Sequence, residues 1–159
     1  MSEENLRDLG VTQICEYQQN RYPVLLIDRI VEAKPGAWAK GLKAFSYNEW
    51  FFPGHFEDDP NVPGFVQVEC LVQVFIMSFL TLPEYKGMKT NFVTIDNVHF
   101  RKKIVPGDTL EIYAELLSGK RGIMKGTACG SISGEEACRM DVVVSIPEVL
   151  DRFRPRIAS

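Results

Sequence analysis

Two side chains near the middle of the chain belong to the residue types that transfer protons, and they stand 14 residues apart. His55 lies in a loop rich in proline and glycine, and Glu69 lies in the apolar run that follows it. Histidine titrates near neutral pH, so it suits the role of a general base. A carboxyl group in apolar surroundings has a raised pKa and can act as an acid. The pair therefore indicates acid–base chemistry.

Each candidate also has an ordinary structural interpretation. His55 alone is typical of a surface turn, and Gly54 and Gly64 are typical turn glycines. Glu69 can be a core carboxylate with all its hydrogen bonds made, although buried carboxylates are rare enough to suggest function.

The apolar run FVQVECLVQVFIMSFL, residues 65–80, must position Glu69. Its Val, Ile and Phe residues would suit a strand, but its length favours a helix, and Pro63 suits a helix start. A helix that is apolar all round is buried on nearly every side. Gln73 then lies one turn beyond Glu69 and can orient its carboxyl group.

The remaining pattern predicts mainly strands. A short helix is expected at 11–20, and a hairpin is expected from strands 22–33 and 37–47. Short turn-like connections join four later segments, which we expect to form an antiparallel meander: 91–103, 109–118, 122–133 and 136–147. The prediction is an α+β fold of about six strands around one buried helix.

Composition limits the class of protein. The 159 residues, 45% apolar and 25% charged, fit one domain, with its core at 20–147 and a C-terminal tail at 148–159. A net charge of −3 argues against nucleic-acid binding. The acidic start MSEENLRDLG lacks the apolar region of a secretion signal, so we expect a cytoplasmic protein. The apolar helix is too short and too polar for a membrane span.

The four cysteines are assigned no chemistry. Cys15, Cys70, Cys129 and Cys138 form no CxxC pair, so no metal site is predicted. Cys129 and Cys138 are equidistant from a turn at 133–134, so we expect them to face each other across two strands as reduced thiols.

Four segments, in order, resemble the 3-hydroxyacyl-(acyl-carrier-protein) dehydratases of fatty-acid synthesis. NRYPVLLIDRI (20–30) is similar to the family's RYPFLLVDR, and HFRKKIVPGDTLEI (99–112) to its FxRPVxPGDxL. Between them stand NEWFFPGHF (48–56) and PNVPG (60–64), followed by Glu69 and Gln73. The spacing of His55 and Glu69 is that of the family motif.

The resemblance implies a hot-dog fold, a curved antiparallel sheet wrapped around one long helix. It implies dehydration of (3R)-hydroxyacyl thioesters to trans-2-enoyl thioesters without a cofactor. His55 would be the base and Glu69 the acid or water-orienting group, while Gly64, Phe65 and Gln73 would bind the substrate. The Gly64 N–H would stabilise the thioester oxyanion, because the missing side chain lets the carbonyl approach.

The resemblance also implies partners. Family members form homodimers, or trimers of dimers, in which the His and Glu of one site come from different subunits. Arg101, Lys102 and Lys103, with Lys120 and Arg121, would dock an acidic carrier protein. The alternative for these cations is a solvated sheet edge. His99 has no ligand partner and is expected to face solvent.

The chain departs from the family pattern beside its histidine. The family's GHFPGxPVMPG reads GHFEDDPNVPG here, and Asn20 replaces a histidine before Arg-Tyr-Pro. Two other functions therefore stay open. One is a hot-dog thioesterase that hydrolyses the thioester, and the other is a non-catalytic subunit that binds acyl thioesters.

Overall fold

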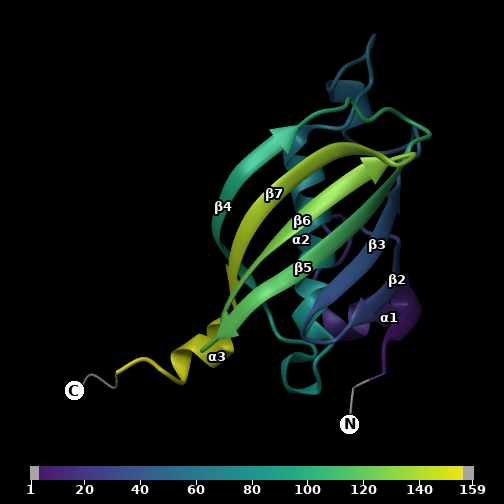
Figure 1. Ribbon diagram of the computed structural model, residues 1–159. Helices are drawn as coiled ribbons and strands as arrows, with labels where there is room; N and C mark the ends of the chain where they lie inside the picture. Colours follow the sequence, from purple (N-terminus) through teal and green to yellow (C-terminus); the bar gives the residue numbers. More distant parts are fainter. Residues whose placement is uncertain (1–3, 156–159) are drawn as a thin grey trace.

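A long helix held against a curved antiparallel sheet forms the centre of the computed structural model, which describes residues 4–155 (Figure 1). This helix, α2 (Gly64–Leu80), begins directly after Pro63 and is buried continuously from Cys70 to Leu80. The helix predicted at 65–80 is confirmed. Its less buried positions cluster near its start and are Gly64, Phe65, Val68 and Glu69.

The sheet has seven strands in the order β1-β2-β3-β5-β6-β7-β4, and every neighbouring pair is antiparallel. The strands are β1 (Leu6–Gly10), β2 (Arg29–Lys34), β3 (Trp38–Ala44), β4 (Asn91–Phe100), β5 (Thr109–Lys120), β6 (Ile123–Ile132) and β7 (Glu135–Ser145). Hairpins join β2 to β3, β5 to β6 and β6 to β7, as the turn-like connections predicted.

The strands differ from the expected pattern in three places. β4 does not begin a four-strand meander: it pairs with β7, because β3 already occupies the free edge of β5. The strand expected at 22–33 exists only from Arg29, since residues 22–28 form a turn and loop held partly by side-chain hydrogen bonds. β1 was not predicted at all, which raises the count from six strands to seven.

The smaller helices lie at the ends of the sheet. α1 (Val11–Tyr17) confirms the helix predicted at 11–20. α3 (Pro147–Asp151) stands where a tail was expected, and it buries Val149. Residues 156–159 of that expected tail lie outside the described residues.

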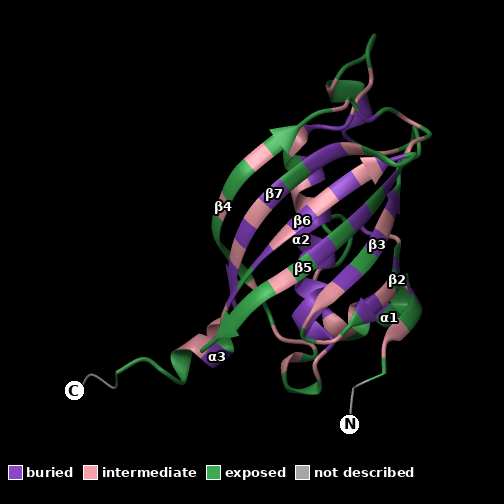
Figure 2. Cartoon of the chain, viewed as in Figure 1, coloured by how far each residue is buried: buried purple, intermediate pink, exposed green. Residues whose placement is uncertain are grey.

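The core lies between α2 and the concave face of the sheet. The helix packs on β3, β5, β6 and β7, and its Phe75 and Phe79 rings meet edge to face. Gly126 on β6 allows this close approach, because a methyl group there would overlap the Phe75 ring. Figure 2 shows buried residues of the inner strands alternating with intermediate or exposed ones, whereas β4 is largely exposed. This arrangement is the hot-dog fold.

The cysteines differ from expectation in one respect. The register pairs Cys129 with Arg139 and Gly130 with Cys138, so the two thiols are offset by one residue and do not face each other. All four cysteines are free. Burial raises the pKa of Cys138 to about 12 and raises that of Cys70 still further, so both thiols stay protonated and unreactive.

Among the described residues, no helix is long and apolar enough to cross a membrane. The expected cytoplasmic location stays a prediction.

Candidate active site

The Glu69 carboxyl group lies in an apolar groove of about 520 Å³ beside the first turns of α2. The other residues that line this groove are Pro23, Val24, Leu26, Trp50, Phe65, Val66, Val68 and Phe92. Loss of hydration in this setting raises the pKa of Glu69, and a hydrogen bond from Gln73 opposes part of that rise. The groove therefore favours the protonated carboxylic acid.

Gln73 holds the Glu69 carboxyl group in one orientation. Its Nε2 donates to Glu69 Oε1 at 2.8 Å and to the Val24 carbonyl at 2.7 Å. Its Oε1 accepts from the N–H groups of Leu26 at 2.8 Å and Ile27 at 3.3 Å. Because backbone donors fix which end of the amide is oxygen, Gln73 must donate to Glu69. A proton on Glu69 then sits on Oε2, the oxygen that Gln73 does not bind.

His55 follows a short 3₁₀ turn, Phe52–Gly54, and is tied twice to Asn61. The Asn61 N–H donates to the His55 carbonyl at 2.9 Å, and the His55 Nδ1 lies 3.0 Å from the Asn61 carbonyl. A carbonyl oxygen can only accept, so Nδ1 carries the proton of the neutral ring. The remaining nitrogen, Nε2, therefore keeps its lone pair free to take a proton.

A second groove, of about 490 Å³, lies at the start of α2 and contains His55, Gly64 and Phe100. The Gly64 and Phe65 N–H groups have no acceptor within the helix, as at every helix start. A methyl group on Gly64 would lie 2.9 Å from the Phe100 ring. The space that glycine leaves is thus filled partly by Phe100, a neighbour that sequence analysis did not foresee. Phe65 turns instead to the Glu69 groove, where its ring lies 6.4 Å from that of Trp50.

Three of the five predicted docking cations line the His55 groove, and each has an acidic partner. Arg101 pairs with Glu136 at 2.5 Å, Lys102 with Glu135 at 2.6 Å, and Lys103 with Asp59 at 2.7 Å.

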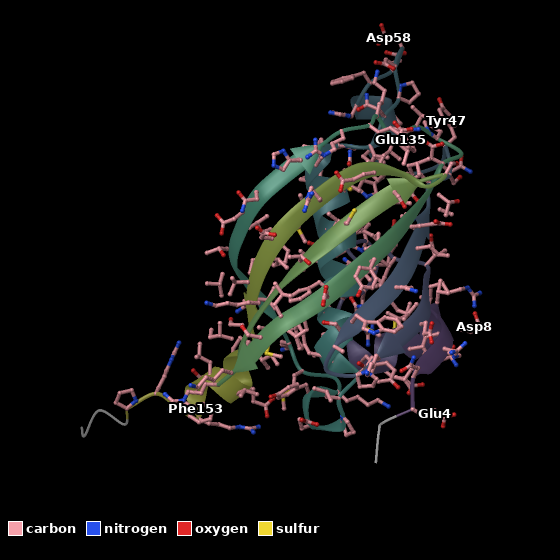
Figure 3. All side chains as sticks on the ribbon, in the orientation of Figure 1. Glu4, Asp8, Tyr47, Asp58, Glu135 and Phe153 are labelled. Carbon is pink, nitrogen blue, oxygen red and sulfur yellow. The ribbon has the colours of Figure 1, made fainter. Side chains whose placement is uncertain are left out.

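The predicted patch of five cations was wrong in extent. Lys120 and Arg121 lie at the opposite end of the sheet, where the Arg121 guanidinium covers the Phe153 ring at 5.6 Å. Figure 3 shows Phe153 and Glu135 at these two opposite ends.

The acidic loop 57–59 projects from the end of the molecule that carries His55, with Asp58 at its tip (Figure 3). Reciprocal backbone hydrogen bonds between Phe56 and Asp59 close this loop, at 3.1 and 3.2 Å. His99 is exposed on β4 opposite Arg139, which confirms that it faces solvent.

Sequence analysis gave no role to Gln67, which is 5% exposed on the first turn of α2. Its Nε2 donates to the Val62 carbonyl at 3.0 Å, while its Oε1 has no hydrogen-bond partner among residues 4–155. An unpaired buried acceptor costs about 1–3 kcal/mol of folding free energy. The available signal was a glutamine two residues before the candidate acid in an otherwise apolar run.

Within one chain, His55 and Glu69 line separate grooves. The structure brings Gln73 to Glu69 and brings Gly64 to His55. It does not bring His55 and Glu69 into one groove, so one chain alone presents two grooves beside the start of α2.

Comparisons with known proteins show the family and the fold. The FabA-like domain matches residues 19–141. A relative from Clostridium novyi (strain NT) is 37% identical over 138 residues, which are 87% of this chain and 97% of the relative. One from Caldicellulosiruptor bescii is 41% identical, over 86% of this chain and 98% of the relative. Both relatives are named 3-hydroxyacyl-[acyl-carrier-protein] dehydratase FabZ.

Solved structures show the same fold. The dehydratase heterocomplex ApeI:P from Xenorhabdus doucetiae contains a chain with a TM-score of 0.72 and 15% identity, covering 89% of this chain and 97% of that one. An uncharacterized protein from Pyrococcus horikoshii gives a TM-score of 0.62 at 11% identity, over 82% of this chain and 91% of that one. The FabA-like domain matches residues 19–141, and the two relatives are 37% and 41% identical to this chain. The chain therefore belongs to the FabA-like family, together with the 3-hydroxyacyl-[acyl-carrier-protein] dehydratases.

Proposed function

We propose that this protein dehydrates (3R)-hydroxyacyl thioesters to trans-2-enoyl thioesters, and hydrates them in reverse, during acyl-chain synthesis. The observation that carries the proposal is the Glu69 carboxyl group, held by Gln73 in an apolar groove that raises its pKa. The names of the relatives support the same reaction.

His55 is the base of this reaction. Its Nε2 takes the proton from C2 of the substrate, and the electron pair of the C–H bond moves toward the thioester carbonyl. The Asn61 carbonyl accepts from Nδ1 and supports the positive charge that the ring then gains.

Glu69 is the acid. Its Oε2 gives a proton to the hydroxyl group on C3, the C–O bond breaks, and water leaves. The enzyme ends with His55 protonated and Glu69 ionised, and exchange of protons with solvent restores the starting state. In the hydration direction, the ionised Glu69 orients and deprotonates the attacking water.

The N–H groups at the start of α2 stabilise the oxyanion that forms on the thioester. The Gly64 N–H is the proposed donor, because Gly64 shares its groove with His55 and lies at the positive end of the helix. Loss of one such donor raises a barrier by about 3 kcal/mol.

The complete site needs two copies of the chain, arranged as a homodimer or a trimer of dimers. His55 of one subunit and Glu69 of the partner subunit meet across the interface, which would join grooves that are separate in one chain. The supporting observation is an apolar surface beside both grooves that the single chain leaves uncovered: Trp50, Phe65, Phe92, Val93 and Phe100 are each 51–65% exposed. β4, which carries three of them, is also an edge strand with free pairing capacity.

The acyl group is carried to this site as a thioester of an acyl carrier protein. Arg101, Lys102 and Lys103 surround the His55 groove and offer cations to an acidic carrier. Since each cation already has an acidic partner in its own chain, the carrier must compete with Glu136, Glu135 and Asp59. This competition makes docking sensitive to salt concentration.

One assay tests the reaction against its rivals. An enoyl thioester, offered as carrier-protein and as coenzyme A derivatives, is followed by ultraviolet absorbance together with release of free thiol. Loss of enoyl absorbance without thiol supports the dehydratase. Thiol release would indicate a thioesterase, and no change with either substrate would indicate a binding subunit.

A further inference from the structure

We infer that Gln67 is a positioning residue that sets the proton arrangement of His55 from helix α2. The inference deepens the proposed function and rests on His55 as the base of that reaction. Gln67 itself reaches no reacting atom in this account and acts only through the segment 61–62.

The imidazole of His55 depends on one carbonyl. Its Nδ1 is held by the Asn61 oxygen at 3.0 Å, and this contact alone among the described residues decides which ring nitrogen stays free. Any shift of the Asn61 peptide therefore changes both the direction of the ring and the nitrogen that carries the proton.

The next carbonyl along the chain is tied to the helix by Gln67. The Val62 oxygen accepts from Gln67 Nε2 at 3.0 Å, and the Val62 N–H donates to the Ile104 carbonyl at 2.9 Å. These two bonds hold the peptide on either side of Val62. The Asn61 carbonyl and the Val62 N–H lie in one peptide plane, which the Ile104 bond holds directly. The Gln67 bond holds the next plane, so it acts on the Asn61 carbonyl through the backbone angles of Val62.

The unpaired oxygen of Gln67 argues against a purely structural role. Gln67 is 5% exposed, and its Oε1 finds no partner among residues 4–155, so an apolar side chain of similar length would suit the packing better. Gln67 also lines the same groove as His55, Asn61 and Gly64. The hydrogen bond from its Nε2 to the Val62 carbonyl explains why a glutamine stands at this position.

The test replaces Gln67 by Met, which keeps the length and removes the donor. Nitrogen NMR of the neutral side chain reports the tautomer of His55, and the exposed His99 serves as the internal reference. In the wild type we expect the proton on Nδ1. In Gln67→Met we expect the population to move toward the Nε2–H tautomer, which a free imidazole favours.

Kinetics with an enoyl thioester supplies the second measurement. We expect kcat of Gln67→Met to fall about 100-fold, the loss that follows a displacement of about 1 Å in a catalytic group. KM should change little, because no contact with the substrate is removed. Ser78→Ala is the matched control, since it removes another buried side-chain bond to a backbone carbonyl on α2, far from His55.

The outcomes separate this inference from the proposed function. If Gln67→Met keeps the Nδ1–H tautomer or keeps wild-type kcat, the inference is overturned. If Gln67→Met and Gln67→Leu both fail to fold while Ser78→Ala folds, Gln67 holds the fold itself and the inference is also overturned. If the wild type shows no hydration, the proposed function fails, whereas the tautomer measurement still decides what Gln67 does.

Discussion

The two grooves beside the start of α2 place titratable groups in opposite surroundings. The Glu69 groove is lined almost entirely by apolar side chains, whereas the His55 groove contains three cations and a carbonyl that holds the imidazole. The first setting raises the pKa of Glu69 and disfavours ionisation of its carboxyl group, whereas in the second the Asn61 carbonyl accepts a hydrogen bond from the imidazole Nδ1. One helix start thus lies between two titratable groups that differ in hydration and in hydrogen bonding.

Replacing Glu69 by Gln should have the largest effect, because the amide keeps the shape but can neither give a proton to the hydroxyl group nor take one from the attacking water. We expect hydration of an enoyl thioester to fall about 10³- to 10⁴-fold, the upper range for loss of an acid or base. His55→Ala should lose activity to a similar extent. Near-wild-type turnover in either variant would contradict the assigned roles.

The same variant should change how stability depends on pH. The pKa of Glu69 is higher in the folded protein than in the unfolded chain, so the folded state binds its proton more tightly. The wild type should therefore lose stability relative to Glu69→Gln as pH rises from the ordinary carboxyl range through the raised pKa. Thermal unfolding across this range measures the difference, and parallel pH profiles would argue against a buried carboxyl group.

Gly64→Ala should have the next largest effect, through the His55 groove. The new methyl group would lie 2.9 Å from the Phe100 ring, so we expect loss of stability and a fall in kcat of about 100-fold. Adding Phe100→Leu makes room and should restore stability without restoring kcat, because the thioester carbonyl still cannot approach. Recovery of kcat in the double variant would limit the role of Gly64 to packing against Phe100.

Gln73→Leu tests which interactions set the pKa of Glu69 in its groove. It leaves N–H and C=O groups of the 24–27 loop without their side-chain partner, and the buried Ile27 N–H alone should cost about 1–3 kcal/mol. It also removes a hydrogen bond that lowers the pKa of Glu69, so the pKa should rise further. In the dehydration direction, where Glu69 acts as the acid, the basic limb of the pH–rate profile should then move to higher pH with a reduced maximum. A shift to lower pH would show that burial does not dominate this pKa.

The acidic loop should have the smallest effect. Asp59 is bound to Lys103 in an exposed ion pair, and such pairs contribute about 0–1 kcal/mol to stability. Glu57→Pro with Asp58→Gly restores the residues usual in the family and removes two carboxylates near His55. Turnover of a coenzyme A thioester should change little, whereas turnover of a carrier-protein thioester should rise slightly, because two carboxylates that repel an acidic carrier are removed. Equal changes with both substrates would mean that these residues act on the site and not on the partner.

The parts of the molecule that the sequence predicts correctly are those set by local patterns of apolar and polar residues. The apolar run at 65–80 predicted the helix α2, and helical spacing predicted that Gln73 lies beside Glu69. The position of β4 was not predictable, because β3 and β4 compete for the same neighbour and only the assembled sheet decides between them. Residues 22–28 have the composition of a strand, yet side-chain contacts from Gln73 hold them as a loop. The hydrogen bond from Gln67 to the Val62 carbonyl was not predictable either, because residue types do not show which side chain binds a backbone carbonyl.

The joining of the two grooves across a subunit interface is the central claim, and mixed dimers test it most directly. Differently tagged His55→Ala and Glu69→Gln chains are co-expressed, and hydration of an enoyl thioester is compared with that of each variant alone. In a mixed dimer one site keeps both residues and the other loses both. Random pairing should therefore restore about a quarter of the wild-type rate.

A double variant carrying both substitutions is the control, since mixing it with Glu69→Gln should restore nothing. Recovery confined to the purified mixed dimer would agree with a site built from His55 of one subunit and Glu69 of the partner subunit. A mixed dimer as inactive as its two parents would contradict it.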